Sequence, residues 1–161
     1  MGQNSLMTSD LLHAYSLGPQ QLADAIADMT PEEIDAQPIV GQWSTRQVVC
    51  HIVDFEPIYA DRMKRVLVEE QPRLIGGDPD LFAKGLGYER RDLENELALM
   101  SAVRKQMISI LSDVDESAYN RTGLHSADGP LTITQLLTRI TNHVPHHLAF
   151  IEEKKKALRG A

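Results

Sequence analysis

Cysteine and long apolar runs are almost absent from this sequence. Cys50 is the single cysteine among 161 residues, which excludes an internal disulfide and a cysteine-rich zinc site and fits a reducing cytoplasm. The sequence has no run of 18 or more apolar residues and no basic N-terminal region followed by an apolar stretch. We therefore expect neither a transmembrane helix nor a signal peptide, and we predict a cytoplasmic location.

Positive charge is also scarce. The chain has 16 Lys and Arg against 23 Asp and Glu, a net charge of -7, which argues against nucleic acid or an anionic membrane as the main partner. Hydrophobic residues make up 42% of the chain, as in an ordinary globular domain. Residues 1–7 resemble a vector-derived leader that ends at a native Met7, so we predict a single domain over residues 8–161.

Apolar residues repeat at intervals of three and four along most of the chain, which predicts helices. Ser44 with Gln47, and Thr132 with Gln135, have the spacing of helix-capping boxes. Gly18-Pro19 either precedes the start of the first main helix or bends one longer helix. The sequence predicts an all-α four-helix bundle, with helices over residues 9–29, 45–69, 90–111 and 133–158 and a short helical turn over 31–36.

The connection between the second and third long helices is unusually long. Residues 71–87 are rich in Pro, Gly and Asp, which break any regular period. A connection of this length is uncommon in a compact domain unless it crosses over or has a function. A crossover from one end of the bundle to the other would make helices 2 and 3 parallel.

Three histidines lie at positions where a helical core would place aliphatic side chains. His143 and His147 are four residues apart on the apolar stripe of the last helix, so both can reach one point beside that helix. His51 lies on the apolar stripe of the second long helix, where it is either a third ligand or a core histidine bonded to a backbone carbonyl. Three neutral imidazoles suit Zn, Ni or Fe(II) and leave a coordination position open for chemistry.

Other polar residues are candidates for the surroundings of this site. Asp54 and Glu56 follow His51 within a turn or so and could accept hydrogen bonds from a ligand imidazole, although surface carboxylates are expected in an acidic protein. His125, in the polar connection over residues 112–130, is either a plain loop residue or a group at the mouth of the site.

Pro145 interrupts the hydrogen bonds of the last helix between the two paired histidines. It cannot donate to the carbonyl of Thr141, so it should bend the helix axis there. The bend either helps to aim His143 and His147 at one point or turns His146 inward, and the sequence leaves both alternatives open.

Several segments together resemble the DinB-like, or YfiT-like, family of metal-dependent four-helix bundle proteins. The resemblance covers nearly the whole chain after the leader, in the order 41–44, 47–54, the crossover, 129–132 and 143–151. It implies up-down-down-up helix order, commonly a homodimer, and a divalent metal held by His51, His143 and His147. Characterised members look like transferases that activate a low-molecular-weight thiol for attack on an electrophile, or like isomerases that use such a thiol.

Three hypotheses follow. The first is a metal-dependent thiol S-transferase, or a related hydrolase or isomerase, that acts on a small-molecule thiol and a small electrophile. Cys50 is not expected to be the nucleophile, because the residue before an inward-facing histidine points about 100° away around the helix. The second is a non-catalytic metal-binding stress-response or sensor protein with the same fold. The third is a plain helical bundle with histidines in its core.

Overall fold

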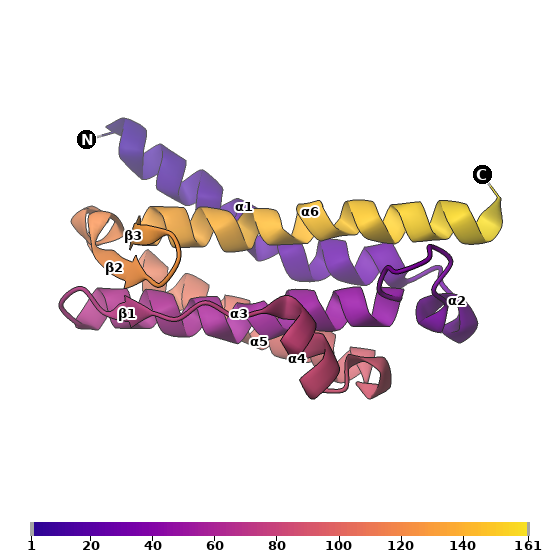
Figure 1. The fold of residues 1–161 in the computed structure, drawn as a ribbon. Coiled ribbons are helices and arrows are strands. Elements are labelled where there is room, and N and C mark those ends of the chain that lie inside the picture. Colours follow the sequence, from indigo (N-terminus) through magenta and orange to yellow (C-terminus); the bar gives the residue numbers. More distant parts are fainter. Residues whose placement is uncertain (1, 161) are drawn as a thin grey trace.

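Four long helices lie side by side in the computed structural model, which describes the backbone of residues 2–160 and the side chains of residues 8–160 (Figure 1). They are α1 (Gly2–Ile26), α3 (Thr45–Val68), α5 (Leu93–Ser112) and α6 (Ile133–Arg159). None of the described helices has the length and apolar character needed to cross a bilayer. The four long helices confirm the predicted all-α four-helix bundle.

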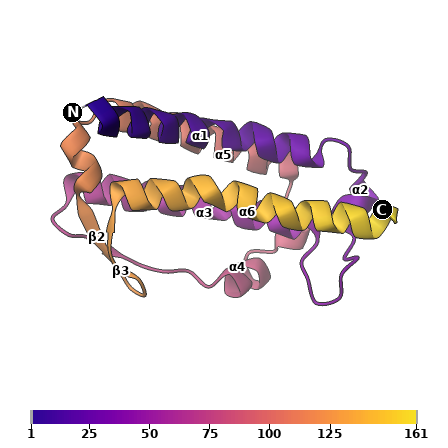
Figure 2. The ribbon, with the colours of Figure 1, turned by 90° about the horizontal axis from the view of Figure 1, so that it is seen from above.

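The helices have the up-down-down-up order that the resemblance implied. In Figure 1, α1 and α6 run from left to right, whereas α3 and α5 run from right to left. Each of α1 and α3 packs against both α5 and α6. The crossover between α3 and α5 returns along the face of α3 and α6 that is turned away from α1 and α5 (Figure 2). This return makes α3 and α5 parallel, as predicted.

Capping boxes fix where α3 and α6 begin. The Ser44 side chain accepts a hydrogen bond from the Gln47 amide, and the Gln47 side chain accepts one from the Ser44 amide; Thr132 and Gln135 form the same pair at α6. These reciprocal bonds satisfy amides that have no partner inside the helix. The third long helix begins at Leu93 rather than at residue 90, because Asp92 caps it through the Asn95 amide.

The two long connections contain short elements that the sequence pattern did not predict. A three-stranded sheet forms at one end of the bundle, with β1 parallel to β2 and β2 antiparallel to β3. Its strands are too short for an alternating pattern to be visible. The added elements are β1 (Arg73–Leu74), β2 (Thr122–His125), β3 (Gly129–Thr132), α4 (Pro79–Gly85), and the 3-10 turns η1 (Tyr88–Arg90) and η2 (Glu116–Asn120); the predicted turn at 31–36 is α2 (Pro31–Asp35).

Two of the long helices continue through an internal proline that the sequence analysis had singled out. Of the two alternatives for Gly18-Pro19, the structure has one longer helix, α1, that includes both residues. Likewise α6 continues through Pro145. Of the predicted leader, Met1 and the side chains of residues 2–7 lie outside the described residues; the backbone of residues 2–7 belongs to α1. That these residues are a leader stays a prediction.

Arg104, on α5, connects all four long helices at the centre of the bundle. Its guanidinium forms a paired ion bridge with Glu56 of α3, with 3.0 Å between Nε and Oε2, and both side chains are almost fully buried. It also donates to the backbone carbonyls of Tyr15 in α1 (2.6 Å) and Ile140 in α6 (3.1 Å). A buried charge needs this degree of pairing, because desolvation is costly.

Gly18 and Pro19 make room for this contact and supply its acceptor. Within a helix the amide of residue 19 would bond the carbonyl of Tyr15, but proline has no N–H, so that carbonyl is free for Arg104. A Cβ at Gly18 would lie 2.1 Å from Nη1 of Arg104. Gly18-Pro19, a dipeptide typical of helix ends, therefore allows the Arg104 guanidinium to pack against the side of α1.

We predict that Gly18→Ala destabilises the protein by about 1–3 kcal/mol, because the added methyl group overpacks the core against Arg104. Urea unfolding measures the change. Gly85→Ala is the matched control, since a Cβ at Gly85 would meet nothing within 4 Å. Equal midpoints for Gly18→Ala and the control would contradict this account of the Gly18 site.

Candidate functional site

The structure brings His51 of α3 together with His143 and His147 of α6. The Nε2 atom of His51 lies 3.0 Å from Nε2 of His143 and 3.1 Å from Nε2 of His147. The ligand atoms of the three side chains all lie within 4.8 Å of one another. His51 is buried and the other two are half-buried, so the cluster is only partly open to solvent. The three residues singled out in the sequence therefore form one cluster.

Burial keeps these imidazoles neutral. It lowers the pKa of His51 and of His147 to about 4. The pKa of His143 falls to about 3, first through burial and then through its two neighbours in the cluster. A neutral imidazole carries a nitrogen lone pair, which is the form that binds a metal.

Two of the three nitrogen–nitrogen separations in the cluster fit a transition-metal ion. With metal–nitrogen bonds of roughly 2.0–2.1 Å, ligand nitrogens lie roughly 2.9–3.4 Å apart for bond angles between 90° and tetrahedral. The distances of 3.0 and 3.1 Å fall in that range. Hydrogen bonds among the rings cannot satisfy all three Nε2 atoms. The Nε2 of His51 carries at most one hydrogen, which cannot serve both His143 and His147. A cation at this point would satisfy all three lone pairs.

Aromatic packing, rather than hydrogen bonding, holds the cluster in place. The buried Nδ1 atoms of His51 and His143 have no hydrogen-bond partner among the described residues. Instead the His51 ring lies between those of Trp43 and Phe55, with centroids 5.2 and 4.9 Å away. The Phe55 ring also lies 5.8 Å from that of His143. The rings of two histidines are therefore oriented by neighbours of fixed shape.

A pocket of about 360 Å³ opens beside His147. It is bounded by the loop before α3, by the start of α4 and by α6. Such a volume suits a small ligand. The lining residues are Gly41, Gln42, Trp43, Val48, Asp80, His147, Phe150 and Lys154.

The carboxylates expected to orient the histidines have other partners. Oδ1 of Asp54 accepts a hydrogen bond from Arg91 at 2.7 Å. Glu56 belongs to the central ion pair with Arg104. Neither forms a hydrogen bond with a histidine of the cluster. These side chains therefore stabilise the packing of the bundle around the site and do not orient the imidazole rings.

The other two candidate histidines stay outside the cluster. His125 lies in the β2–β3 hairpin, where its Nδ1 accepts from the amides of Ala127 (3.3 Å) and Asp128 (3.2 Å). It therefore stabilises a turn. His146 is exposed and packs edge-on against His147 and Phe150, with ring centroids 4.9 and 5.2 Å away. Pro145 has not turned His146 inward.

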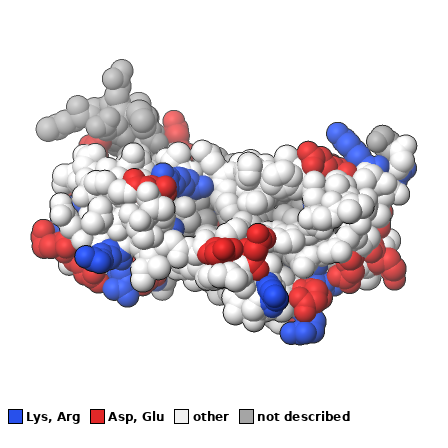
Figure 3. Space-filling model, viewed as in Figure 1, with Lys and Arg blue, Asp and Glu red and all other residues white. Residues whose placement is uncertain are grey.

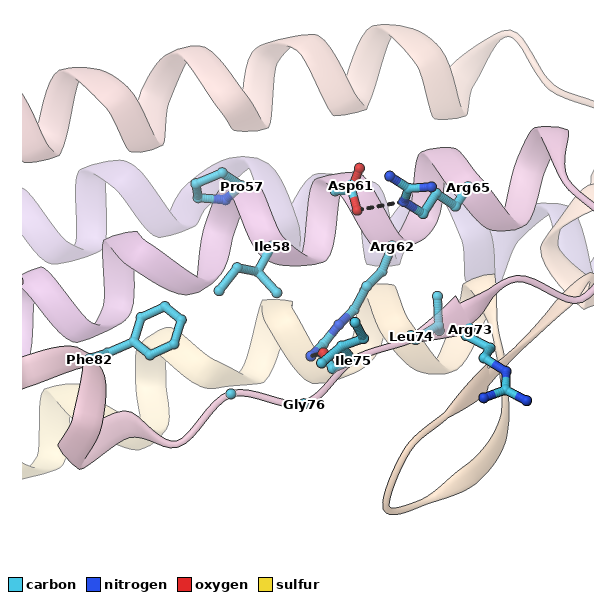
Figure 4. Close-up of a pocket in the computed structure, with 11 residues that line it drawn as sticks. Pro57, Ile58, Asp61, Arg62, Arg65, Arg73, Leu74, Ile75, Gly76 and Phe82 are labelled. Atoms are coloured by element: carbon cyan, nitrogen blue, oxygen red, sulfur yellow. Dashed lines mark hydrogen bonds and ion pairs between the residues drawn. The ribbon is translucent and has the colours of Figure 1, made fainter. Parts of the chain in front are cut away.

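A hollow larger than the pocket at His147 lies elsewhere. It measures about 650 Å³ and runs between α3 and the crossover (Figure 4). Arg62 reaches across it from α3 and donates to the carbonyl of Ile75, which ties the crossover to the bundle. Phe82 closes the end nearer the cluster, because its ring lies 5.9 Å from that of Phe55. Phe82 thus lines this groove and contacts Phe55, which in turn packs on His51 and His143.

Sequence reasoning did not find the residues that line the pocket at His147. Asp80, Phe150 and Lys154 carry no motif, and Lys154 lies in a basic run near the end of the last helix. Trp43 belongs to a segment that carried the family resemblance, but nothing in the sequence placed its ring on His51. The spacing of Lys154, seven residues beyond His147 on one helix face, was the one available signal.

A family model described as the DinB superfamily matches residues 14–151. The chain belongs to the DinB superfamily. A protein of Oceanobacillus iheyensis named "putative metal-dependent hydrolase" is 29% identical over 133 residues, 83% of this chain and 77% of that protein. One of Bacillus mycoides with the same description is 25% identical over 140 residues, 87% of this chain and 80% of that one.

A solved structure has the same fold. YfiT from Bacillus subtilis, described as a probable metal-dependent hydrolase with an unusual four-helix bundle topology, superposes with a TM-score of 0.87. The match covers 94% of this chain and 87% of YfiT at 24% identity. The comparison confirms the fold of this DinB superfamily member, including its uncommon helix order.

We predict that the metal-free protein loses stability as the pH falls from about 6.5 to about 4, partly because of the cluster. The three histidines have a lower pKa when folded than the ordinary value of 6.5, so the unfolded chain binds more protons in this window. Urea unfolding in chelator at several pH values measures the loss. His143→Ala should lose less stability than wild type over the same window.

The control for this comparison is His13→Ala, because His13 is exposed on α1. It should keep the wild-type dependence on pH. Identical pH dependence in wild type and His143→Ala would show that the cluster histidines are not held neutral by the fold.

Proposed function

We propose that this DinB superfamily member binds one divalent metal ion, Zn, Ni or Fe(II), through His51, His143 and His147. The observation that carries the proposal is that the Nε2 atoms of His143 and His147 lie 3.0 and 3.1 Å from that of His51, with the ligand atoms of all three within 4.8 Å of one another. The description of its relatives as metal-dependent supports it. When bound there, the metal would supply Lewis acidity, which makes a thiol or a water ionise near neutral pH.

We further propose that the reaction is the transfer of a low-molecular-weight thiol to a small electrophile. The carboxylates near the site are poorly placed to act as a general base, which favours a nucleophile that ionises easily. Glu56 and the Oδ1 atom of Asp54 are paired with arginines, and Asp80, the one carboxylate among the described pocket residues, is exposed. A thiol is far more acidic than water, so it can react without a dedicated base.

Cys50 does not supply the thiol. Its side chain is fully buried and lies against the carbonyl of Tyr88, with 3.6 Å between Sγ and the oxygen. Burial raises the pKa of Cys50 to about 12, so the thiolate form is scarce at neutral pH. The nucleophile therefore enters the pocket as a separate small molecule.

Hydrolysis is the second candidate reaction. The relatives carry that description, and Asp80 at the pocket could accept a proton from water. A protein that binds metal without turnover, as a sensor or in stress response, is the non-catalytic alternative. A homodimer and a cytoplasmic location remain predictions. The stretch 140–151 of α6 contains no Lys, Arg, Asp or Glu, and its exposed residues would suit a contact between two copies. Figure 3 shows uncharged surface along the middle of the corresponding face of the molecule.

We predict about one Zn, Ni or Fe per chain in untagged protein, and loss of that metal in His51→Ala and in His147→Ala. Elemental analysis after gel filtration measures the content. His146→Ala is the matched control, because His146 neighbours the cluster but is exposed. Wild type that cannot be loaded with any of the three ions would refute the metal centre.

We predict that the loaded protein consumes a small thiol together with monochlorobimane, forming the carbon–sulfur bond and releasing chloride and a proton. Fluorescence follows the product. The rate should fall to background in His147→Ala and stay unchanged in His13→Ala. Hydrolysis of a p-nitrophenyl ester without any thiol would favour the second candidate, and bound metal without either reaction would favour the non-catalytic alternative.

A further inference from the structure

Lys154 is a buried lysine that has no ion-pair partner among the described carboxylates. It is 2% exposed, and its Nζ donates to the neutral Oε1 of Gln42 over 3.4 Å. Lys155, the next residue, instead pairs with Asp28 and Glu152. An ammonium group buried without an anion is costly. Lys154 is therefore expected to have a partner that is not part of the chain.

The position of Lys154 relates it directly to the histidine cluster. Lys154 follows His147 by seven residues, which is two helical turns, so both side chains lie on one face of α6. The two residues line the same pocket of about 360 Å³. The helical rise between the two residues is roughly 10 Å, so the cluster and Lys154 border one small pocket at two separate points.

The charges at the pocket favour an anion. Lys154 is the one cation and Asp80 the one anion among its described lining residues, and a divalent metal at the histidines would make the sum positive. The remaining walls are apolar or neutral, including Trp43 and Phe150. Burial lowers the pKa of Lys154, while Glu153 opposes the shift; an anionic ligand would stabilise the charged form.

We propose that Lys154 binds the carboxylate of a small thiol whose sulfur lies at the three-histidine centre. The substrate class is thus a carboxylate-bearing thiol, held at two points by Lys154 and by the centre. This inference rests on the proposed function and narrows it. Lys154 acts as a binding residue that selects the thiol, since a neutral thiol of the same shape would leave the ammonium unpaired.

The test uses protein loaded with Co(II), whose sulfur-to-metal absorption band reports thiol binding independently of turnover. Wild type is titrated with 3-mercaptopropionate and with 3-mercaptopropionamide, which has the same shape but no charge. We expect the carboxylate to bind about 10-fold or more tightly than the amide, as for a hydrogen bond to a charged group. Lys154→Met should remove this preference, and Lys154→Arg should keep part of it.

Lys156→Met is the matched control, because it removes one positive charge from an exposed position on the same helix. It should leave the preference unchanged, and circular dichroism checks that every variant is folded. Equal affinity of wild type for the two thiols, or an equal loss for both in Lys154→Met, would overturn the carboxylate site alone. Absence of any cobalt spectrum in wild type would instead overturn the metal centre, and this inference with it.

Discussion

The guanidinium of Arg104 is the point on which the arrangement of the four helices depends. It bonds Glu56, the carbonyl of Tyr15 and the carbonyl of Ile140, and so joins α5 to α3, α1 and α6. Ile140 precedes His143 by one turn, and Glu56 follows His51 by five residues. The contact that fixes α3 and α6 relative to each other along the bundle axis therefore lies next to His51 and His143. Breaking such a buried pair typically costs about 3–5 kcal/mol.

The same region shows how the chain uses residues that weaken helices. Pro19 leaves the carbonyl of Tyr15 without its helical donor, and Arg104 supplies the replacement. The cluster itself is oriented by shape, because Trp43 and Phe55 pack on His51 while its Nδ1 has no described partner. A metal-binding histidine usually donates the proton on its second ring nitrogen to a hydrogen-bond acceptor. In this cluster the packing of the rings orients His51 instead, so core packing and the geometry of the cluster are coupled.

The sequence predicted the features that depend on local periodicity. Helix positions, the capping boxes at Ser44 and Thr132, and the inward direction of His51, His143 and His147 follow from spacing along one helix at a time. The short sheet could not be predicted, since β1 has two residues and Gly123 and Pro130 interrupt the other two strands. Nor could the partners of Asp54 and Glu56, which are arginines 37 and 48 residues away and were brought near only by the packing of whole helices.

The site is built partly from packed helices and partly from connecting segments, which tolerate sequence change to different degrees. All three histidines lie on α3 and α6, where any shift would disturb the core. Half of the pocket wall comes instead from the loop around Gly41–Trp43 and from α4 in the crossover. Connections tolerate sequence change better than packed helices do, so the ligand accepted by the pocket can change while the three-histidine geometry is kept. Lys154 differs from the loop residues of the pocket, because it is buried and lies on the same helix as His143 and His147, so the proposed selection of the ligand by Lys154 would be tied to the packed part of the site.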